Sequence, residues 1–189
     1  MVAVAAVALV VAFVGAQASR GNLRPRAADA DAIARIARVN VGRAGAQTNR
    51  STTGAVLSAS GRYVAFVSGA THLVRDDSNG TRDVFVRDLR TSWTSRVSLS
   101  STESESNGPS AKPSISADGS VVAFPSSATN LVAHDDNDLQ DVFVRDLVTG
   151  ATVRASVDKN GDDPNAGSFS SSISADGRYV AFVSYRLKQ

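Results

Sequence analysis

The stretch DVFVRDL occurs twice without a change, at Asp83–Leu89 and at Asp141–Leu147. The two copies are 141 − 83 = 58 residues apart. A longer stretch, ISADGRYVAF at 173–182, keeps the same step, since it returns as ISADGSVVAF at 115–124 and as LSASGRYVAF at 57–66. A constant period without insertions is the signature of a repeat architecture. We therefore predict that DVFVRDL is a structural unit of a repeated fold rather than a binding motif.

Each repeat is predicted to contain four short strands. GRYVAFVS and DVFVRDL are rich in β-branched and aromatic residues and are bounded by turn residues. TSRVSLS and its copy ATVRASV supply a third strand, and the short segment around Ser-Ile-Ser begins the next unit. Polar turns such as Ala-Asp-Gly join the strands.

Four-stranded units in tandem predict an all-β fold of the β-propeller type. Strands such as VFV are apolar on both faces, as a blade packed between two neighbours requires. The predicted core residues are those that recur in these strands: Phe66, Phe124, Phe182, Val84, Phe85, Val86, Val142, Phe143 and Val144.

The repeat also resembles that of TolB-type propellers, whose WD-like unit reads Pro-Ser-x-Ser-Pro-Asp-Gly before an apolar strand. Pro113–Gly119 matches this pattern, with Ala117 in place of the second proline. Ser60 departs from the Asp position, and Ser171 departs from the first proline. The resemblance extends over residues 36–184 and implies the fold, with loops that present binding residues to protein partners in the bacterial cell envelope.

The strands amount to about two and a half blades, whereas propellers close with about four to eight. Full blades are predicted near 54–99 and 112–157, a half blade near 170–184 and a single strand near 36–41. We predict a partial propeller over residues 36–189, which is either a piece of a longer ring or completes a ring by self-association. Residues 19–35 are predicted to be a linker.

Residues 1–18 form an apolar segment without a charged residue. Ala16-Gln17-Ala18 has the small-x-small form of a signal-peptidase site, so we expect a signal peptide and an exported, periplasmic or extracellular protein. An uncleaved segment of this kind would instead anchor the chain in a membrane. The net charge is only +2, and the basic residues are scattered, so no nucleic-acid partner is expected. The chain has no cysteine, which excludes disulfides and thiolate sites.

The loop before each DVFVRDL copy contains the pattern Asp-x-Asn-x-x-x-Asp. Calcium takes several oxygen ligands from one short loop, so calcium is a candidate cofactor. Leu139 in the second loop lacks the side-chain oxygen that a helix–loop–helix calcium site would need, and turn bonding by Asp and Asn is the alternative. The predicted calcium ligands are Asp77, Asn79 and Asp83 in one repeat and Asp135, Asn137 and Asp141 in the next.

Patterns typical of an enzyme are weak. His72 and His134 occupy positions that do not recur, and the Ser-x-x-Lys spacing of Ser156 and Lys159 is interpreted as chance. Trp93 breaks the repeat, because the next unit has Ala151 there, and it is expected either to anchor a partner or to cover the edge of its own blade.

The favoured hypothesis is a non-catalytic exported scaffold that binds a protein partner. The alternative is the propeller portion of a larger enzyme, such as a serine peptidase whose catalytic domain lies elsewhere. A third hypothesis is a carbohydrate-binding or calcium-dependent adhesion module.

Overall fold

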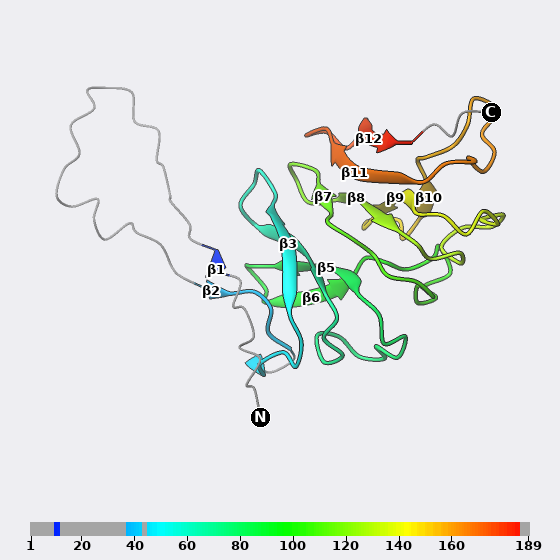
Figure 1. The fold of residues 1–189 in the computed structure, drawn as a ribbon. Coiled ribbons are helices and arrows are strands. Elements are labelled where there is room, and N and C mark those ends of the chain that lie inside the picture. The colour runs from blue at the N-terminus through cyan, green and yellow to red at the C-terminus, as the bar shows by residue number, and fades with distance from the viewer. Residues whose placement is uncertain (1–9, 12–36, 43–44, 186–189) are drawn as a thin grey trace, which may run out of the picture.

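The computed structural model describes residues 10–11, 37–42 and 45–185, and its strands form antiparallel sheets (Figure 1). We call the first four-stranded sheet blade 1; it comprises β3 (Thr52–Leu57), β4 (Tyr63–Ser68), β5 (Asp83–Asp88) and β6 (Trp93–Arg96). Blade 2 comprises β7 (Ser114–Ile115), β8 (Val121–Ser126), β9 (Asp141–Asp146) and β10 (Thr152–Arg154). The half-blade comprises β11 (Ser168–Ile173) and β12 (Val180–Ser184).

Both blades have the same strand order and the same register. Each sheet runs in chain order from its first strand to its fourth, so every connection within a blade joins adjacent strands. Phe66 is opposite Phe85 in blade 1, and Phe124 is opposite Phe143 in blade 2. The predicted all-β fold with four-stranded units is thereby confirmed, and DVFVRDL supplies the third strand of each blade.

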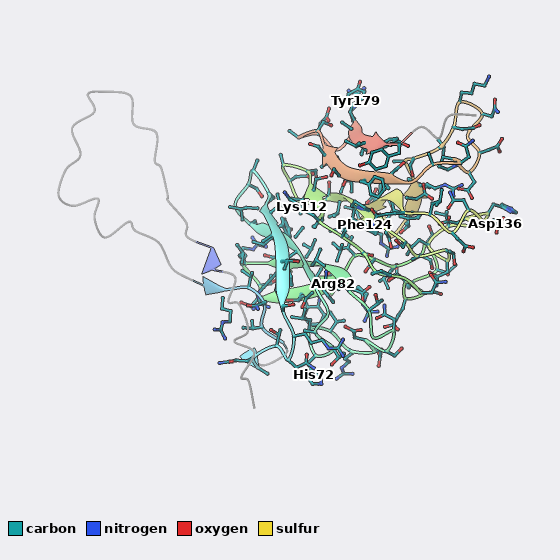
Figure 2. All side chains as sticks on the ribbon, in the orientation of Figure 1. His72, Arg82, Lys112, Phe124, Asp136 and Tyr179 are labelled. Carbon is teal, nitrogen blue, oxygen red and sulfur yellow. The ribbon has the colours of Figure 1, made fainter. Side chains whose placement is uncertain are left out.

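The interface between the blades is an apolar core. Val84 and Val86 of blade 1 pack against Phe124 and Phe143 of blade 2, and all four side chains are buried. The rings of Phe124 and Phe143 are 6.1 Å apart between centroids. Figure 2 shows Phe124 inside the stacked sheets, whereas Tyr179 projects at the outer edge. Burial of both faces of these strands explains why their sequences are continuously apolar.

The opposite face of blade 1 has its own core. Phe66 and Phe85 are stacked with centroids 5.8 Å apart, and Val39 from the preceding segment packs on them. Blade 1 is therefore covered on both faces in the described part of the chain.

The prediction of core residues was wrong for two positions at the half-blade. Phe182 and Val144 are only partly buried, whereas their equivalents Phe124 and Val86 are buried. Among the described residues no third strand pairs with β12, so Phe182 lacks the cross-strand ring that Phe143 gives Phe124. Val144 faces a sheet of two strands instead of four.

Backbone hydrogen bonds join the turns of successive blades. Ser60 N donates to Ala117 O at 2.9 Å, and Ala117 N donates to Ala175 O at 2.8 Å. Gly119, in the middle one of these turns, has φ +82°, and a Cβ there would lie 2.2 Å from the ring of Tyr63. Glycine is thus required both by the turn and by the close approach of blade 1.

The N-terminal predictions lie mostly outside the described residues. Of the apolar segment 1–18, only β1 (Val10–Val11) is described, and it pairs with β2 (Ala37–Arg38). The strand predicted near 36–41 is present as β2 and as an isolated bridge between Val41 and Gln47. Residues 19–35 are not described. In the described ranges, no helix is long and apolar enough to cross a membrane.

Candidate functional site

The two acidic loops connect the second and third strands of blades 1 and 2, at residues 69–82 and 127–140. Each ends on a fully buried aspartate, Asp83 or Asp141. Asp141 accepts hydrogen bonds from Ser156 Oγ at 2.6 Å and from Asn137 Nδ2 at 3.2 Å. Asp83 accepts the equivalent bond from Ser98 Oγ at 2.6 Å. These bonds fix the loop to the start of the third strand and to the segment after the fourth.

The two predicted asparagine ligands hold the loops in turns. Asn79 Oδ1 accepts the backbone N–H of Thr81 at 3.1 Å, and Asn137 Oδ1 accepts that of Leu139 at 2.7 Å. Their amide nitrogens, rather than their oxygens, point at the buried aspartates. This is the turn bonding that the sequence left open as the alternative to calcium binding.

The arginine that ends the fourth strand of each blade contacts the acidic side chains of the loop. In blade 2, Arg154 Nη1 is 2.5 Å from Asp163 Oδ1, 3.4 Å from Asp135 Oδ1 and 3.9 Å from Asp141 Oδ2. In blade 1, Arg96 Nη2 is 3.4 Å from Asp77 Oδ1, and its Nη1 pairs with Glu105. Because the guanidinium is always charged, it supplies a permanent cation to the acidic loop.

Sequence reasoning missed the arginines and one acid of each cluster. Arg96 and Arg154 keep the repeat step, since 154 − 96 = 58, and so do Glu105 and Asp163, since 163 − 105 = 58. Searching the repeat register for paired charges would have found them. A search within one loop could not, because they lie beyond the following strand.

The blade 2 cluster has more negative than positive charge. Oxygens of Asp135, Asp141 and Asp163 lie within 4.8 Å of one another around the single guanidinium of Arg154. Both carboxylate oxygens of Asp135 are buried without a hydrogen bond. Burial, followed by the charge of Asp141, raises the pKa of Asp135 to about 6.

Burial has the same effect on two further aspartates of the acidic loops and their flanking strands. Burial also raises the pKa of Asp141, and in blade 1 it raises the pKa of Asp77. Of the predicted ligands, the structure brings Asp135 and Asp141 together and adds Asp163, while Arg154 takes a cation's position between them. Calcium binding stays a prediction.

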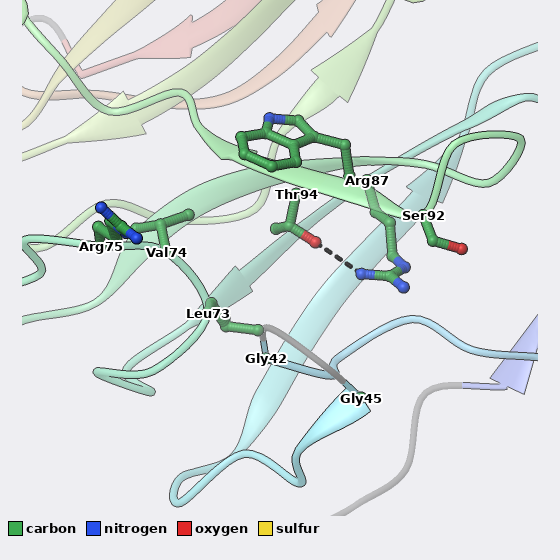
Figure 3. A pocket seen from close by; sticks show the side chains of 9 residues that line it. Gly42, Gly45, Leu73, Val74, Arg75, Arg87, Ser92 and Thr94 are labelled. Carbon is green, nitrogen blue, oxygen red and sulfur yellow. Dashed lines mark hydrogen bonds between the residues drawn. The ribbon is translucent and has the colours of Figure 1, made fainter.

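A separate hollow of about 350 Å³ opens on blade 1 (Figure 3). Its apolar wall is formed by Leu73, Val74 and Trp93, and its charged wall by Arg75 and Arg87. A volume of this size is at the lower end of the range for small-ligand sites. Gly42 and Gly45 complete the rim on the side that faces Arg87.

Arg87 and Trp93 are the chemically distinctive groups of the hollow. Arg87 Nη1 donates to Thr94 Oγ1 at 2.8 Å, and Figure 3 shows the guanidinium pointing toward the segment that carries Gly42 and Gly45. Burial lowers the pKa of Arg87. Trp93 is 64% exposed, so most of its side chain is open to solvent.

The residues considered for hydrolysis lie elsewhere. His72 and His134 are exposed loop residues, and neither lines the hollow. Ser156 is buried, accepts the N–H of Val142 at 2.9 Å and donates to Asp141. Ser156 is thus part of the structural network of blade 2.

Tandem four-stranded antiparallel blades define the chain as a β-propeller repeat protein. No protein-family model and no curated protein matches the sequence. Among solved structures, the chain is similar to TolB from Acinetobacter baumannii, with 16% identity and a TM-score of 0.45 over 79% of this chain and 29% of that one. A putative TolB from Agrobacterium tumefaciens gives 20% identity and a TM-score of 0.44 over 68% of this chain and 36% of that one.

The propeller domain of the Trilobed protease from Pyrococcus furiosus gives 16% identity and a TM-score of 0.44, over 70% of this chain and 34% of that one. The chain therefore spans about a third of the length of these structures. Similarity at this level concerns the fold alone.

Proposed function

We propose that this chain is a non-catalytic, exported binding module that recognises a protein partner through the outer edge of blade 1. The observation that supports this proposal is Trp93. The side chain is 64% exposed beside the hollow, at a position where the repeat otherwise has Ala151. Tryptophan is among the residues most enriched at the energetic centres of protein interfaces.

The surroundings of Trp93 favour a partner site. The ring lies between two hollows, since it also lines a groove of about 570 Å³ between the outer parts of blades 1 and 2. Tyr63 and Val148 line that groove, and Val148 is 81% exposed. Aromatic and apolar side chains next to concave surface are what an anchoring residue of a partner requires. The stiff sheets beneath keep these side chains in place.

The test uses a photo-crosslinking aromatic amino acid, which keeps a large ring at the anchor position, at position 93 and, as the matched control, at position 151 of the full-length chain. We expect a discrete adduct with one protein from position 93 and none from position 151. The captured protein, once purified, should bind the wild-type chain saturably and should bind Trp93→Ala at least about tenfold more weakly. Identical adducts from both positions, or a purified protein that binds the variant equally well, would contradict the proposal.

Export rests on the apolar segment and on the Ala-Gln-Ala site. Sequencing the N-terminus of the protein recovered from the cell envelope or the medium tests it. A mature chain that begins at Ser19 supports cleavage after Ala18, whereas recovery only from the cytoplasm would refute export.

A further inference from the structure

The arginine of DVFVRDL has different partners in the two blades. In blade 2, Arg145 is 4% exposed, and both terminal nitrogens of its guanidinium are paired, whereas its Nε is buried without a hydrogen-bond partner. Its Nη1 donates to Ser100 O at 2.8 Å and to Gly150 O at 2.6 Å, and its Nη2 pairs with the carboxylate of Glu103. An arginine and a carboxylate form strong, directional pairs, so Glu103, whose side chain is 62% exposed, neutralises the buried Arg145 from the solvent side.

Arg87 occupies the equivalent position in blade 1, since 145 − 87 = 58. It keeps the bond to the threonine of the fourth strand, Thr94. The equivalent of Glu103, however, is Gly45, since 103 − 45 = 58. Among the described residues, no carboxylate pairs with Arg87. The rim of the hollow at Gly45 therefore lacks the carboxylate that neutralises Arg145 in blade 2.

Gly45 and Glu103 have similar local backbone conformations. Gly45 has φ +77° and Glu103 has φ +63°, both left-handed. The bridge between Val41 and Gln47 also matches the bridge between Leu99 and Glu105. A Cβ at Gly45 would meet nothing within 4 Å. The described positions of the two loops therefore match, and the difference at this repeat position is a glycine in place of a glutamate.

We infer that the hollow beside Arg87 binds a carboxylate of the partner, in the place that Glu103 fills in blade 2. This inference rests on the proposed partner-binding function. Arg75 adds a second positive charge at the rim, where blade 2 has Ala133. Leu73, Val74 and Trp93 make the remaining wall apolar. The chemistry fits an acidic side chain or a C-terminal carboxylate flanked by apolar residues.

Three short peptides test the charge requirement with the full chain. Ac-Leu-Glu-Leu-NH₂ carries a side-chain carboxylate, Ac-Leu-Gln-Leu-OH a terminal one, and Ac-Leu-Gln-Leu-NH₂ neither. Trp93 is the only tryptophan of the chain, so its fluorescence reports binding beside Arg87 directly. We expect at least one carboxylate peptide to bind about tenfold or more tightly than the neutral peptide.

The stronger of the two carboxylate peptides identifies the source of the group. Equal binding of all three peptides, or no binding of any at about 1 mM, would overturn the inference.

Two variants make the test independent of stability. Gly45→Glu supplies the missing carboxylate from within the chain, as Glu103 does in blade 2, and should abolish binding of the carboxylate peptides. Gly45→Gln imposes the same backbone strain without the charge and should retain binding. Arg87→Met should lose the preference for the charged peptides. Wild-type affinity in Gly45→Glu would refute the inference.

The two proposals fail separately. A protein adduct from position 93 that does not depend on Arg87 would preserve partner binding and remove the carboxylate site. Binding of the carboxylate peptides without any adduct from position 93 would preserve the carboxylate site and contradict the proposed partner binding.

Discussion

Replacing Phe124 by alanine tests whether the interface between the blades holds the fold together. Phe124 is fully buried, with its ring 6.1 Å from that of Phe143 and packed on the valines of blade 1. Truncating a buried phenylalanine costs about 3–5 kcal/mol. With a urea m-value of about 2 kcal/mol/M, the unfolding midpoint should fall by about 2 M.

Phe182 is the matched control, because it occupies the same repeat position but is only partly buried. Phe182→Ala should cost less than half as much, since part of its ring already contacts water and no third strand pairs with β12 in the described residues. Urea unfolding followed by tryptophan fluorescence and circular dichroism measures both. If Phe124→Ala does not fold, Phe124→Leu, with an expected cost of below about 1.5 kcal/mol, replaces it.

Equal losses in the two alanine variants would refute the reasoning. They would mean that the half-blade is covered in solution, as self-association would achieve.

Three further predictions concern the acidic cluster and the turns. The pKa of Asp135 is raised to about 6 in the folded chain, against about 4 when unfolded, so its contribution to stability is present below about pH 4 and lost as the pH rises through about 6. The urea midpoint of the wild type should therefore fall over this interval more steeply than that of Asp135→Asn, and parallel curves would contradict the assignment. Arg154→Met leaves three carboxylates within 4.8 Å without their cation, so calcium should raise its melting temperature, and a chelator should lower it, more than in the wild type; a variant indifferent to calcium would remove the calcium prediction. Gly119→Ala should destabilise the chain by about 1–3 kcal/mol more than Gly161→Ala, because both have positive φ but only Gly119 faces the Tyr63 ring, and equal midpoints would show that the ring moves aside at no cost.

The blades were predictable because the repeat states the same strand pattern several times. An apolar run such as VFV is ambiguous alone, but its recurrence at a fixed step next to Asp and turn residues leaves only a repeated sheet. The degree of burial was less predictable. Phe182 and Phe124 have the same sequence context, and they differ only in what lies beside them in space.

The candidate site shows the same limit. Arg87 and Arg145 lie in identical heptapeptides, so no local pattern separates an open arginine from a neutralised one. The difference lies at Gly45 and Glu103, which belong to the connecting segment before each blade. Likewise, the cation of each acidic loop comes from the end of the fourth strand, and only the fold brings Arg96 or Arg154 to it.

The turn-to-turn hydrogen bonds have a consequence for how such a chain can grow. The contacts from Ser60 to Ala117 and from Ala117 to Ala175 join peptide groups, so they do not depend on which side chains the turns carry. A duplicated unit would find a compatible neighbour on each side without inventing a new interface. Tandem duplication is then structurally permissive, and each new copy is free to diverge at its rim, as the glycine in place of glutamate already illustrates.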